Sequence, residues 1–339
     1  MGITPTSTGC SFRTMNLPEH WYRRSLWLWL LAPLALLFCL LVWLRRQLYR
    51  RGWLASEAVD VPVIVVGNIS VGGTGKTPLV LWLADFLRRQ GYRPGLISRG
   101  YGGQSEQWPL ALDSDADPKV VGDEALLLAR RSGCPMVVGP DRVAAARLLR
   151  ERHDVDVILS DDGLQHYRLQ RQIEIAVLDG ARRLGNRLCL PAGPLREPPS
   201  RLRSVDLVVV NGEPSACGEW AMSLRPVALN SLVGEPTRAL ATLSGLRVHG
   251  VAGIGHPQRF FATLRQAGCE VVEHPYTDHH PYRAGELDFG DDLPVLMTEK
   301  DAVKYTSYAD RRHWYLPVVA ELPDAFGQAV LAKLESNNG

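Results

Sequence analysis

The 339-residue sequence lacks the marks of several protein classes. It has no Cys-x-x-Cys pair, so neither a zinc site nor a disulfide framework is expected. Its net charge is only +2, and no basic tract is interleaved with aromatic residues, which argues against bulk nucleic-acid binding. With 46% hydrophobic and 22% charged residues, the chain has the composition of a globular protein long enough for two domains. We expect six scattered cysteines to be reduced and buried: Cys10, Cys39, Cys134, Cys189, Cys217 and Cys269.

One long apolar run is present near the N-terminus. Residues 25–44 carry no charge and are dominated by Leu and Trp, and a helix of this length spans about 30 Å, the thickness of a bilayer core. No small-residue cleavage site follows it, only the arginines of residues 45–51, so it is not a cleaved signal. We expect residues 1–52 to form a polar N-terminus and a membrane-associated helix. Arginines flank both ends, and a kink at Pro33 would let the helix lie in one leaflet, so the pattern leaves open whether it crosses the bilayer.

A phosphate-binding loop follows the apolar run. Residues 63–66 form a β-branched strand, a glycine-rich turn comes next, and apolar residues at helical spacing begin after Lys76 and Thr77. Such a loop points backbone N–H groups at phosphate oxygens, and the helix N-terminus adds a partial positive charge. Lys76 is expected to reach the β- and γ-phosphates of a nucleoside triphosphate, with the Thr77 hydroxyl on Mg²⁺. The predicted nucleotide-binding residues are Ser70, Val71, Gly72, Gly73, Thr74, Gly75, Lys76 and Thr77.

The loop departs from the strict motif at one position and leaves a second function class open. Ser70 stands where the strict motif has Gly. The core from Gly72 to Thr77 is also similar to that of ParA-type ATPases, although those carry a signature Lys where this chain has Val71. The alternative hypothesis is therefore a membrane-tethered P-loop ATPase that positions a protein partner. A GTPase is disfavoured because no clear Asn-Lys-x-Asp motif is present.

Short apolar runs alternate with helical segments after residue 61, which is typical of βαβ units. We expect a P-loop NTPase-like α/β/α domain over residues 53–210, a linker over 211–240 and a smaller α/β domain over 241–339. The predicted strands are 63–66, 94–98, 136–139, 155–160, 173–178, 205–210, 248–252, 270–272 and 295–298, and helices are predicted at 79–87, 125–130 and 142–152.

Polar residues follow several of these strands, where ligands collect in open α/β sheets. Asp161 and Asp162 have the form of a Walker B element that holds Mg²⁺, or of a simple turn, and the sequence does not choose between the two carboxylates. Asp123 begins a helix, and the helix dipole alone would account for an acidic residue at that position. The loop Asp278-His279-His280 fits either a surface loop or an Asp–His general base.

Six motifs in one order resemble the tetraacyldisaccharide 4′-kinase family, the lipid A 4′-kinases of Gram-negative bacteria. The likeness extends from about Trp21 to the C-terminus. It implies ATP-dependent phosphorylation of the 4′-hydroxyl of a tetraacylated glucosamine disaccharide 1-phosphate at the cytoplasmic face of the inner membrane. The motifs are residues 67–78 (GNISVGGTGKTP), 98–103 (SRGYGG), 122–124 (GDE), 161–166 (DDGLQH), 190–197 (LPAGPLRE) and 298–301 (TEKD).

The resemblance also implies roles for individual residues, in two α/β/α domains joined by a β-ribbon with the site between them. Asp123 looks like the catalytic base, paired with His279, although His280 is adjacent, and Lys76 assists transfer. Neither a nucleic acid nor an obligate protein partner is expected beside the lipid substrate and the membrane. Metal-site or phosphate-site residues are expected at Asp161, Asp162 and Glu197, and substrate or phosphate contacts at Arg99, Tyr101, His166 and Arg196.

Overall fold

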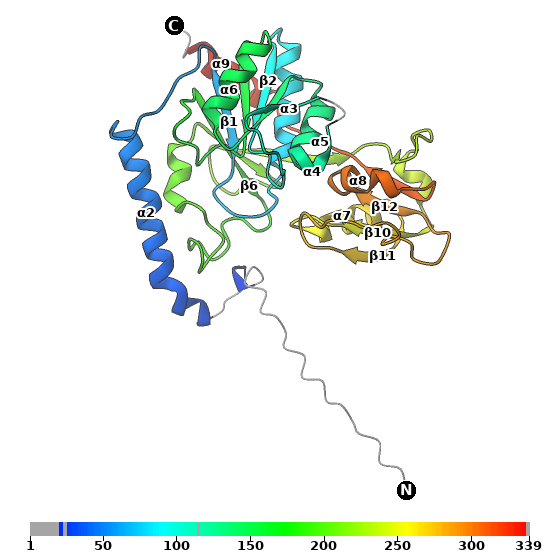
Figure 1. The fold of residues 1–339 in the computed structure, drawn as a ribbon. Coiled ribbons are helices and arrows are strands. Elements are labelled where there is room, and N and C mark those ends of the chain that lie inside the picture. Colours follow the sequence, from blue (N-terminus) through cyan, green and yellow to red (C-terminus); the bar gives the residue numbers. More distant parts are fainter. Residues whose placement is uncertain (1–19, 23–25, 114–115, 337–339) are drawn as a thin grey trace.

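The computed structural model describes residues 20–22, 26–113 and 116–336. Figure 1 shows a large α/β domain, a smaller α/β domain beside it, and one long helix along the outside of the large domain. The predicted polar N-terminus, Cys10 and the arginines that precede the apolar run lie outside the described residues. The α/β fold with an N-terminal apolar helix is the predicted one.

The large domain is built on a nine-stranded sheet with the order β14-β8-β7-β6-β1-β5-β2-β4-β3. All neighbours pair in parallel except at the edges, where β3 and β14 are antiparallel. β1 is central and fully buried, as expected of a β-branched strand covered on both faces. Each strand predicted for this domain is found within two residues of its expected ends. The bounds are β1 Val63–Gly67, β2 Pro94–Ser98, β3 Leu110–Ala111, β4 Met136–Val138, β5 Val157–Asp161, β6 Ile173–Asp179, β7 Leu207–Asn211, β8 Glu219–Pro226 and β14 Val318–Glu321.

Helices cover both faces of this sheet. One core lies under α3 (Lys76–Arg89), α5 (Asp123–Ser132) and α9 (Asp324–Ser336), and the short α4 (Pro118–Val121) adds Val121 to it. The other core lies under α6 (Arg142–Arg152), with partly buried Leu202 from the 3₁₀ helix η2 (Pro199–Ser204). α6 has its predicted bounds because Asp141 caps it, accepting hydrogen bonds from two backbone N–H groups of the first turn.

The smaller domain has a five-stranded sheet with the order β11-β10-β12-β13-β9. α7 (Pro257–Gln266) packs on one face through Phe261 and Leu264, and α8 (Glu299–Tyr305) packs on the other through Tyr305. The strand bounds are β9 Asn230–Ser231, β10 Arg247–Ala252, β11 Glu270–Pro275, β12 Val295–Thr298 and β13 His313–Leu316, and the 3₁₀ helices are η3 (Leu240–Leu243) and η4 (Thr306–Tyr308).

The division between the domains differs from the predicted one at 211–240 and at the C-terminus. β8 lies in the predicted linker but joins the large sheet, and β14 returns to that sheet as its antiparallel partner. α9 then packs on the large domain, where the buried ring of Phe326 lies 5.5 Å from that of Trp82. The small domain is therefore inserted between β8 and β14. The sequence gives no local pattern for pairing between strands so far apart, so this division could not be predicted.

The apolar run forms η1 (Leu26–Leu31) and α2 (Ala32–Arg50). Pro33 lies in the first turn of α2, where its missing N–H is not needed, so it costs α2 no internal hydrogen bond. Most side chains of α2 are exposed. Among the described residues, Leu28–Arg50 is the one segment long and apolar enough to cross a membrane, by length and composition alone.

The prediction that all cysteines are reduced and buried is wrong. Cys39 of α2 and Cys189 form a disulfide, and Cys217 is exposed. The two partners lie 150 residues apart in the sequence, so the pair arises only from the packing of α2 on the large domain. The Arg46 guanidinium supports the same packing, because Nη2 donates to Ser204 Oγ at 2.6 Å. The disulfide thus ties the apolar helix to the start of the loop of residues 189–197.

Candidate functional site

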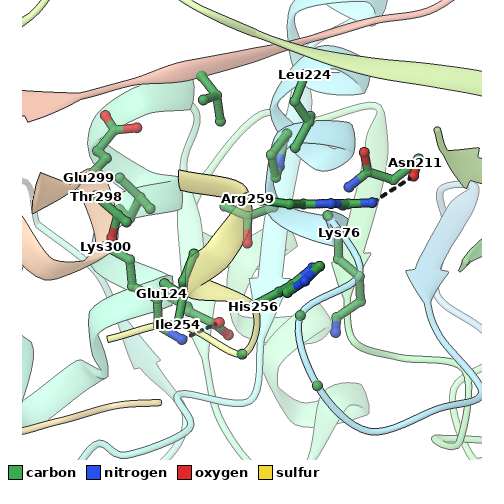
Figure 2. Close-up of a pocket in the computed structure, with 18 of the residues that line it drawn as sticks. Lys76, Glu124, Asn211, Leu224, Ile254, His256, Arg259, Thr298, Glu299 and Lys300 are labelled. Atoms are coloured by element: carbon green, nitrogen blue, oxygen red, sulfur yellow. Dashed lines mark hydrogen bonds and ion pairs between the residues drawn. The ribbon is translucent and has the colours of Figure 1, made fainter. Parts of the chain in front are cut away.

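A cavity of 1180 Å³ opens between the two domains. The large domain lines it with the P-loop, the end of β5 and the start of α5, and the small domain with the turn before α7, the loop of residues 278–279 and the start of α8. Figure 2 shows Lys76 of the P-loop opposite His256 and Arg259 of the small domain, with Lys300 and Glu124 farther along the wall. The site is therefore complete only when both domains contribute.

The P-loop packs closely against the side chain of Asn211, which donates to Thr74 O at 3.2 Å. Gly75 has a φ of +97°, and a Cβ there would lie 2.7 Å from Asn211 Nδ2, so only glycine fits. Val71 lines the cavity, but its N–H donates to Pro194 O at 2.8 Å. Every predicted nucleotide residue lines the cavity except Ser70 and Thr74, which are buried beneath it.

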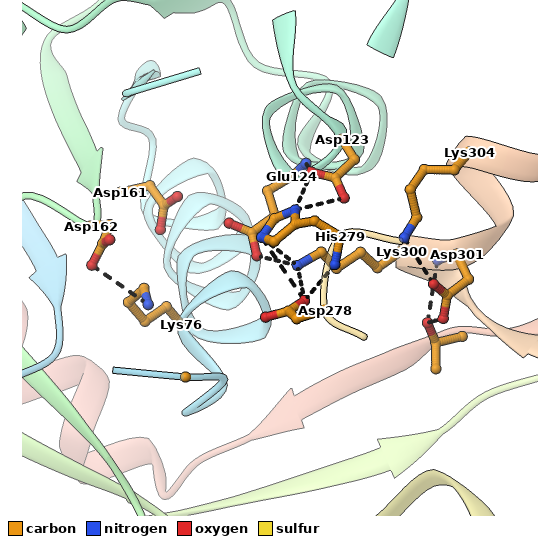
Figure 3. A network of polar contacts seen from close by, with 12 residues as sticks. Lys76, Asp123, Glu124, Asp161, Asp162, Asp278, His279, Lys300, Asp301 and Lys304 are labelled. Carbon is orange, nitrogen blue, oxygen red and sulfur yellow. Dashed lines mark hydrogen bonds and ion pairs between the residues drawn. The ribbon is translucent and has the colours of Figure 1, made fainter. Parts of the chain in front are cut away.

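Asp161 and Asp162 have different surroundings at the end of β5 (Figure 3). The Asp162 carboxylate lies 3.5 Å from Lys76 Nζ and 3.0 Å from Arg196 Nη1. Burial alone would raise the pKa of Asp162, but these two cations outweigh it and lower the pKa to about 2. For Asp161, burial and the nearby charge of Glu124 raise the pKa to about 7. A cation beside Asp161 would relieve the cost of its buried charge.

These carboxylates fit a magnesium ion. Asp161 Oδ1 is buried and has no hydrogen-bond partner, and Thr77 and Asp162 line the same part of the cavity. Carboxylate and hydroxyl oxygens are ligands that Mg²⁺ prefers. Within the described part of the chain, no three His, Cys, Asp or Glu side chains gather closely enough to hold an ion. Phosphate oxygens and water would therefore complete its coordination.

Glu197 lies away from this group. It is 1% exposed and does not line the cavity. Gln165 Nε2 donates to its carboxylate at 2.8 Å, the Tyr167 hydroxyl also donates to it, and Arg201 forms an ion pair with it at 3.5 Å. In this conformation Glu197 holds neighbouring side chains in place and does not reach the predicted metal site.

The predicted pairing of Asp123 with His279 is present. His279 Nδ1 lies 3.2 Å from both carboxylate oxygens of Asp123, the first residue of α5. His280 instead contacts Glu286, with Nε2 at 2.6 Å from the carboxylate, so the structure distinguishes the two histidines. His279 lines the cavity and Asp123 lies behind it. His279 has a φ of +60°, which is costly for a residue other than glycine and is often found at functional sites.

The contact with His279 changes the pKa of both groups. The hydrogen bond to Asp123 raises the pKa of His279 above its usual range, against the opposing effects of burial and Lys300. Burial would raise the pKa of Asp123, but its hydrogen bond with His279 and the charge of Lys300 lower it. The pair therefore holds a carboxylate beside an imidazole that titrates above an ordinary histidine.

The four predicted substrate contacts all line the cavity. Arg99 and Arg196 provide positive charge there, and the Tyr101 ring lies 5.0 Å from that of His279. His166 is mostly neutral at pH 7, because burial and the nearby arginines lower its pKa to about 4. The two arginines make this wall suitable for an anionic ligand.

Sequence reasoning gave no role to two cations in the cavity. Lys300 Nζ lies 2.9 Å from Glu124 Oε1, and Arg259 donates to Asn211 O at 3.2 Å, close to the P-loop. Lys300 belongs to the TEKD motif, and this motif is the one feature of the sequence that points to it. The motif does not indicate which side chains Lys300 contacts. Those partners come from the other domain and from a distant loop.

The chain is similar to proteins of one known family over most of its length. The family model described as tetraacyldisaccharide-1-P 4′-kinase matches residues 27–335. The tetraacyldisaccharide 4′-kinase of Alkalilimnicola ehrlichii is 56% identical over 326 residues, 95% of this chain and 98% of that protein, and that of Nitrosococcus oceani is 53% identical over 94% of each. The crystal structure of LpxK from Aquifex aeolicus in complex with ATP has a TM-score of 0.77 and 27% identity, covering 91% of this chain and 99% of that one. The chain belongs to the tetraacyldisaccharide-1-phosphate 4′-kinase family.

Proposed function

We propose that this kinase of lipid A biosynthesis transfers the γ-phosphoryl group of ATP, as its Mg²⁺ complex, to the 4′-hydroxyl of a tetraacylated glucosamine disaccharide 1-phosphate at the inner membrane. The family membership decides against the alternative of a partner-positioning ATPase. One observation carries the mechanism: the P-loop and the Asp123–His279 pair line or back a single cavity between the domains.

The P-loop end of the cavity would hold the triphosphate. Lys76 and the Gly72–Gly73 backbone face the cavity, and Lys76 would exchange part of its contact with Asp162 for phosphate oxygens. Thr77, Asp161 and Asp162 would hold Mg²⁺, which supplies charge neutralisation between the phosphates. Arg196 lies beside Asp162 and adds a second positive charge to this end.

The other end would remove the proton from the acceptor. As the 4′-oxygen forms its bond to the γ-phosphorus, the bond to the ADP oxygen breaks and the hydroxyl proton passes to the Asp123–His279 pair. His279 faces the cavity, and the Asp123 carboxylate accepts from its Nδ1–H and balances the imidazolium charge. The pair then returns the proton to solvent.

α2 would bring this site to the lipid, with the catalytic domains on the cytoplasmic side where ATP is available. Cys39 joins α2 to Cys189, at the start of the loop of residues 189–197. That loop also contacts the P-loop, through Val71 N–H and Pro194 O, and carries Arg196 to Asp162. The apolar helix and the phosphate site are thus attached to the same loop.

Labelled ATP incubated with the disaccharide lipid, followed by thin-layer separation, tests the reaction and its metal. We expect chelation of divalent cations to abolish label in the lipid and Mg²⁺ to restore it. Asp161→Asn and Asp162→Asn should each lower transfer by about 10²–10³-fold, the usual cost of losing one preorganised electrostatic partner. Release of label as free phosphate without lipid would contradict the acceptor assignment. Full transfer in the chelator would contradict the metal assignment alone.

Membrane attachment is tested with two leucines in the middle of α2. Leu37 is 51% exposed and Leu41 55% exposed. A charge costs about 2.5–3.5 kcal/mol at the centre of a membrane helix, so we expect the Leu37→Glu/Leu41→Glu variant to lose most binding to phospholipid vesicles in a flotation assay. The matched control is Val233→Glu/Leu246→Glu, which changes two exposed apolar residues of the small domain. Equal flotation of both variants would contradict the role of α2.

A further inference from the structure

Lys300 connects the base to both domains. It lies at the start of α8 in the small domain, and its side chain is largely buried. Its Nζ lies 2.9 Å from Glu124 Oε1 of α5, 2.9 Å from Asp278 Oδ1 and 3.2 Å from His279 Nε2. Figure 3 shows these groups together, with the Lys300 ammonium between the two carboxylates and the imidazole. A lysine has three N–H donors, and each has a partner here.

These contacts fix the tautomer of His279. An ammonium group only donates hydrogen bonds, so when His279 is neutral its Nε2 accepts from Lys300. A neutral imidazole has one N–H, which is then on Nδ1 and faces the Asp123 carboxylate at 3.2 Å. The Nε2 lone pair is thereby kept on the side of the ring away from Asp123. The opposite tautomer would place two donors together and leave Asp123 facing a lone pair.

The charges around His279 come from three elements, and a fourth element adds an aromatic ring. α5 supplies Asp123 and Glu124, the histidine's own loop supplies Asp278, and α8 supplies Lys300. The Tyr101 ring of the glycine-rich loop is tilted against the imidazole, 5.0 Å away. The carboxylates favour the imidazolium, and Lys300 opposes them. Without Lys300, the negative groups would have no opposing charge at this contact.

We propose that Lys300 is a positioning residue for the phosphoryl transfer, which holds His279 in the Nδ1–H tautomer and so keeps Nε2 unprotonated until the acceptor hydroxyl binds. When the acceptor hydroxyl arrives, it replaces Lys300 at Nε2, and the ammonium stays between Glu124 and Asp278. Because Glu124 is in the large domain and His279 in the small one, this arrangement forms only when the domains are docked. The inference rests on the Asp123–His279 assignment made above.

The test is the pH profile of kcat/KM for the lipid in Lys300→Met. Loss of the ammonium removes both the charge and the hydrogen bond that favour neutral His279. The acidic limb of the profile, where kcat/KM falls as the pH is lowered, should therefore move to higher pH. We expect turnover to fall about 10–100-fold, part of the usual contribution of a positioned base, with little change in ATP affinity. Lys300→Arg keeps the charge and should keep the limb near its wild-type position.

The matched control is Arg131→Met. It removes another ion pair between α5 and α8, the 2.6 Å contact of Arg131 with Glu299, but Arg131 does not line the cavity. Its acidic limb should stay at the wild-type pH. If Lys300→Met and Arg131→Met behave alike, Lys300 only docks the domains and the proposal is overturned.

Two further measurements separate the possible failures. Full activity of His279→Ala would refute the assignment of His279 to the base. Low activity of His279→Ala together with an unchanged acidic limb in Lys300→Met would refute only the role proposed for Lys300. If Lys300→Met fails to fold, ¹⁵N NMR of histidine-labelled wild-type protein decides, with His279→Gln identifying the signal. A protonated Nδ1 and an unprotonated Nε2 above the acidic limb are expected, and the reverse pattern overturns the proposal.

Discussion

Lys76→Ala should abolish measurable transfer of phosphate to the lipid. The Lys76 ammonium is the P-loop cation that faces the cavity, and it lies 3.5 Å from the Asp162 carboxylate. Loss of a single preorganised donor to a developing oxyanion lowers kcat by about 10²–10³-fold, and loss of a full charge beside three phosphates should cost at least as much. Label incorporated into the lipid, separated by thin-layer chromatography, measures the effect.

The control for this variant is Lys119→Ala, which removes an exposed ammonium from α4 outside the cavity. It should transfer phosphate at close to the wild-type rate. Thermal unfolding of both variants checks that the fold is retained, since Arg196 still pairs with Asp162 when Lys76 is absent. Near-normal lipid phosphorylation by Lys76→Ala would refute the assignment of the P-loop as the triphosphate site.

Asp123→Ala and His279→Ala should each lower turnover by about 10²–10⁴-fold, the usual contribution of a positioned base. ATP affinity should persist, because neither residue is part of the P-loop. The double variant should be no slower than the slower single variant, since groups that act as one unit are strongly non-additive. His280→Ala is the matched control: this neighbour contacts Glu286 and does not line the cavity. A double variant far slower than either single one would show that the two residues act separately.

The pH profile gives a second test of the same pair. The hydrogen bond to Asp123 raises the pKa of His279, so wild-type activity should fall as the pH drops through that raised pKa. Asp123→Asn removes the negative charge that favours the imidazolium. The residual activity of this variant should therefore persist to lower pH than that of the wild type. An acidic limb that moves to higher pH in Asp123→Asn would contradict the dyad.

Much of the fold follows from local pattern. The buried run of β1 and the capped helix α6 have strong periodicity and clear end signals, so their bounds are close to those predicted. β14 is different: it is a short edge strand whose pairing with β8 depends on the whole inserted domain lying between them. The disulfide of Cys39 with Cys189 is equally non-local, and spacing alone cannot reveal it.

The site divides in the same way. Lys76 and Asp161 follow strands or open helices in recognisable motifs, so their position at one edge of the sheet is predictable. The choice of His279 over His280 depends on a backbone with φ of +60° that turns one ring towards α5. Glu197 is a carboxylate in a motif loop, but in this conformation it lies outside the cavity. There it forms an ion pair with Arg201 and accepts a hydrogen bond from Tyr167. The partners of Lys300 exist only after the two domains meet.

The insertion of the small domain also restricts how it can move. The chain leaves the large sheet after β8 and returns to it at β14, and these neighbouring strands stay paired up to the point where Val227 N–H donates to Pro317 O at 3.0 Å. Because the two paired strands would have to twist together, we expect the small domain to reorient over a narrower range than it would on one flexible tether. The domain that carries His279 is thereby kept close to the helix that carries Asp123.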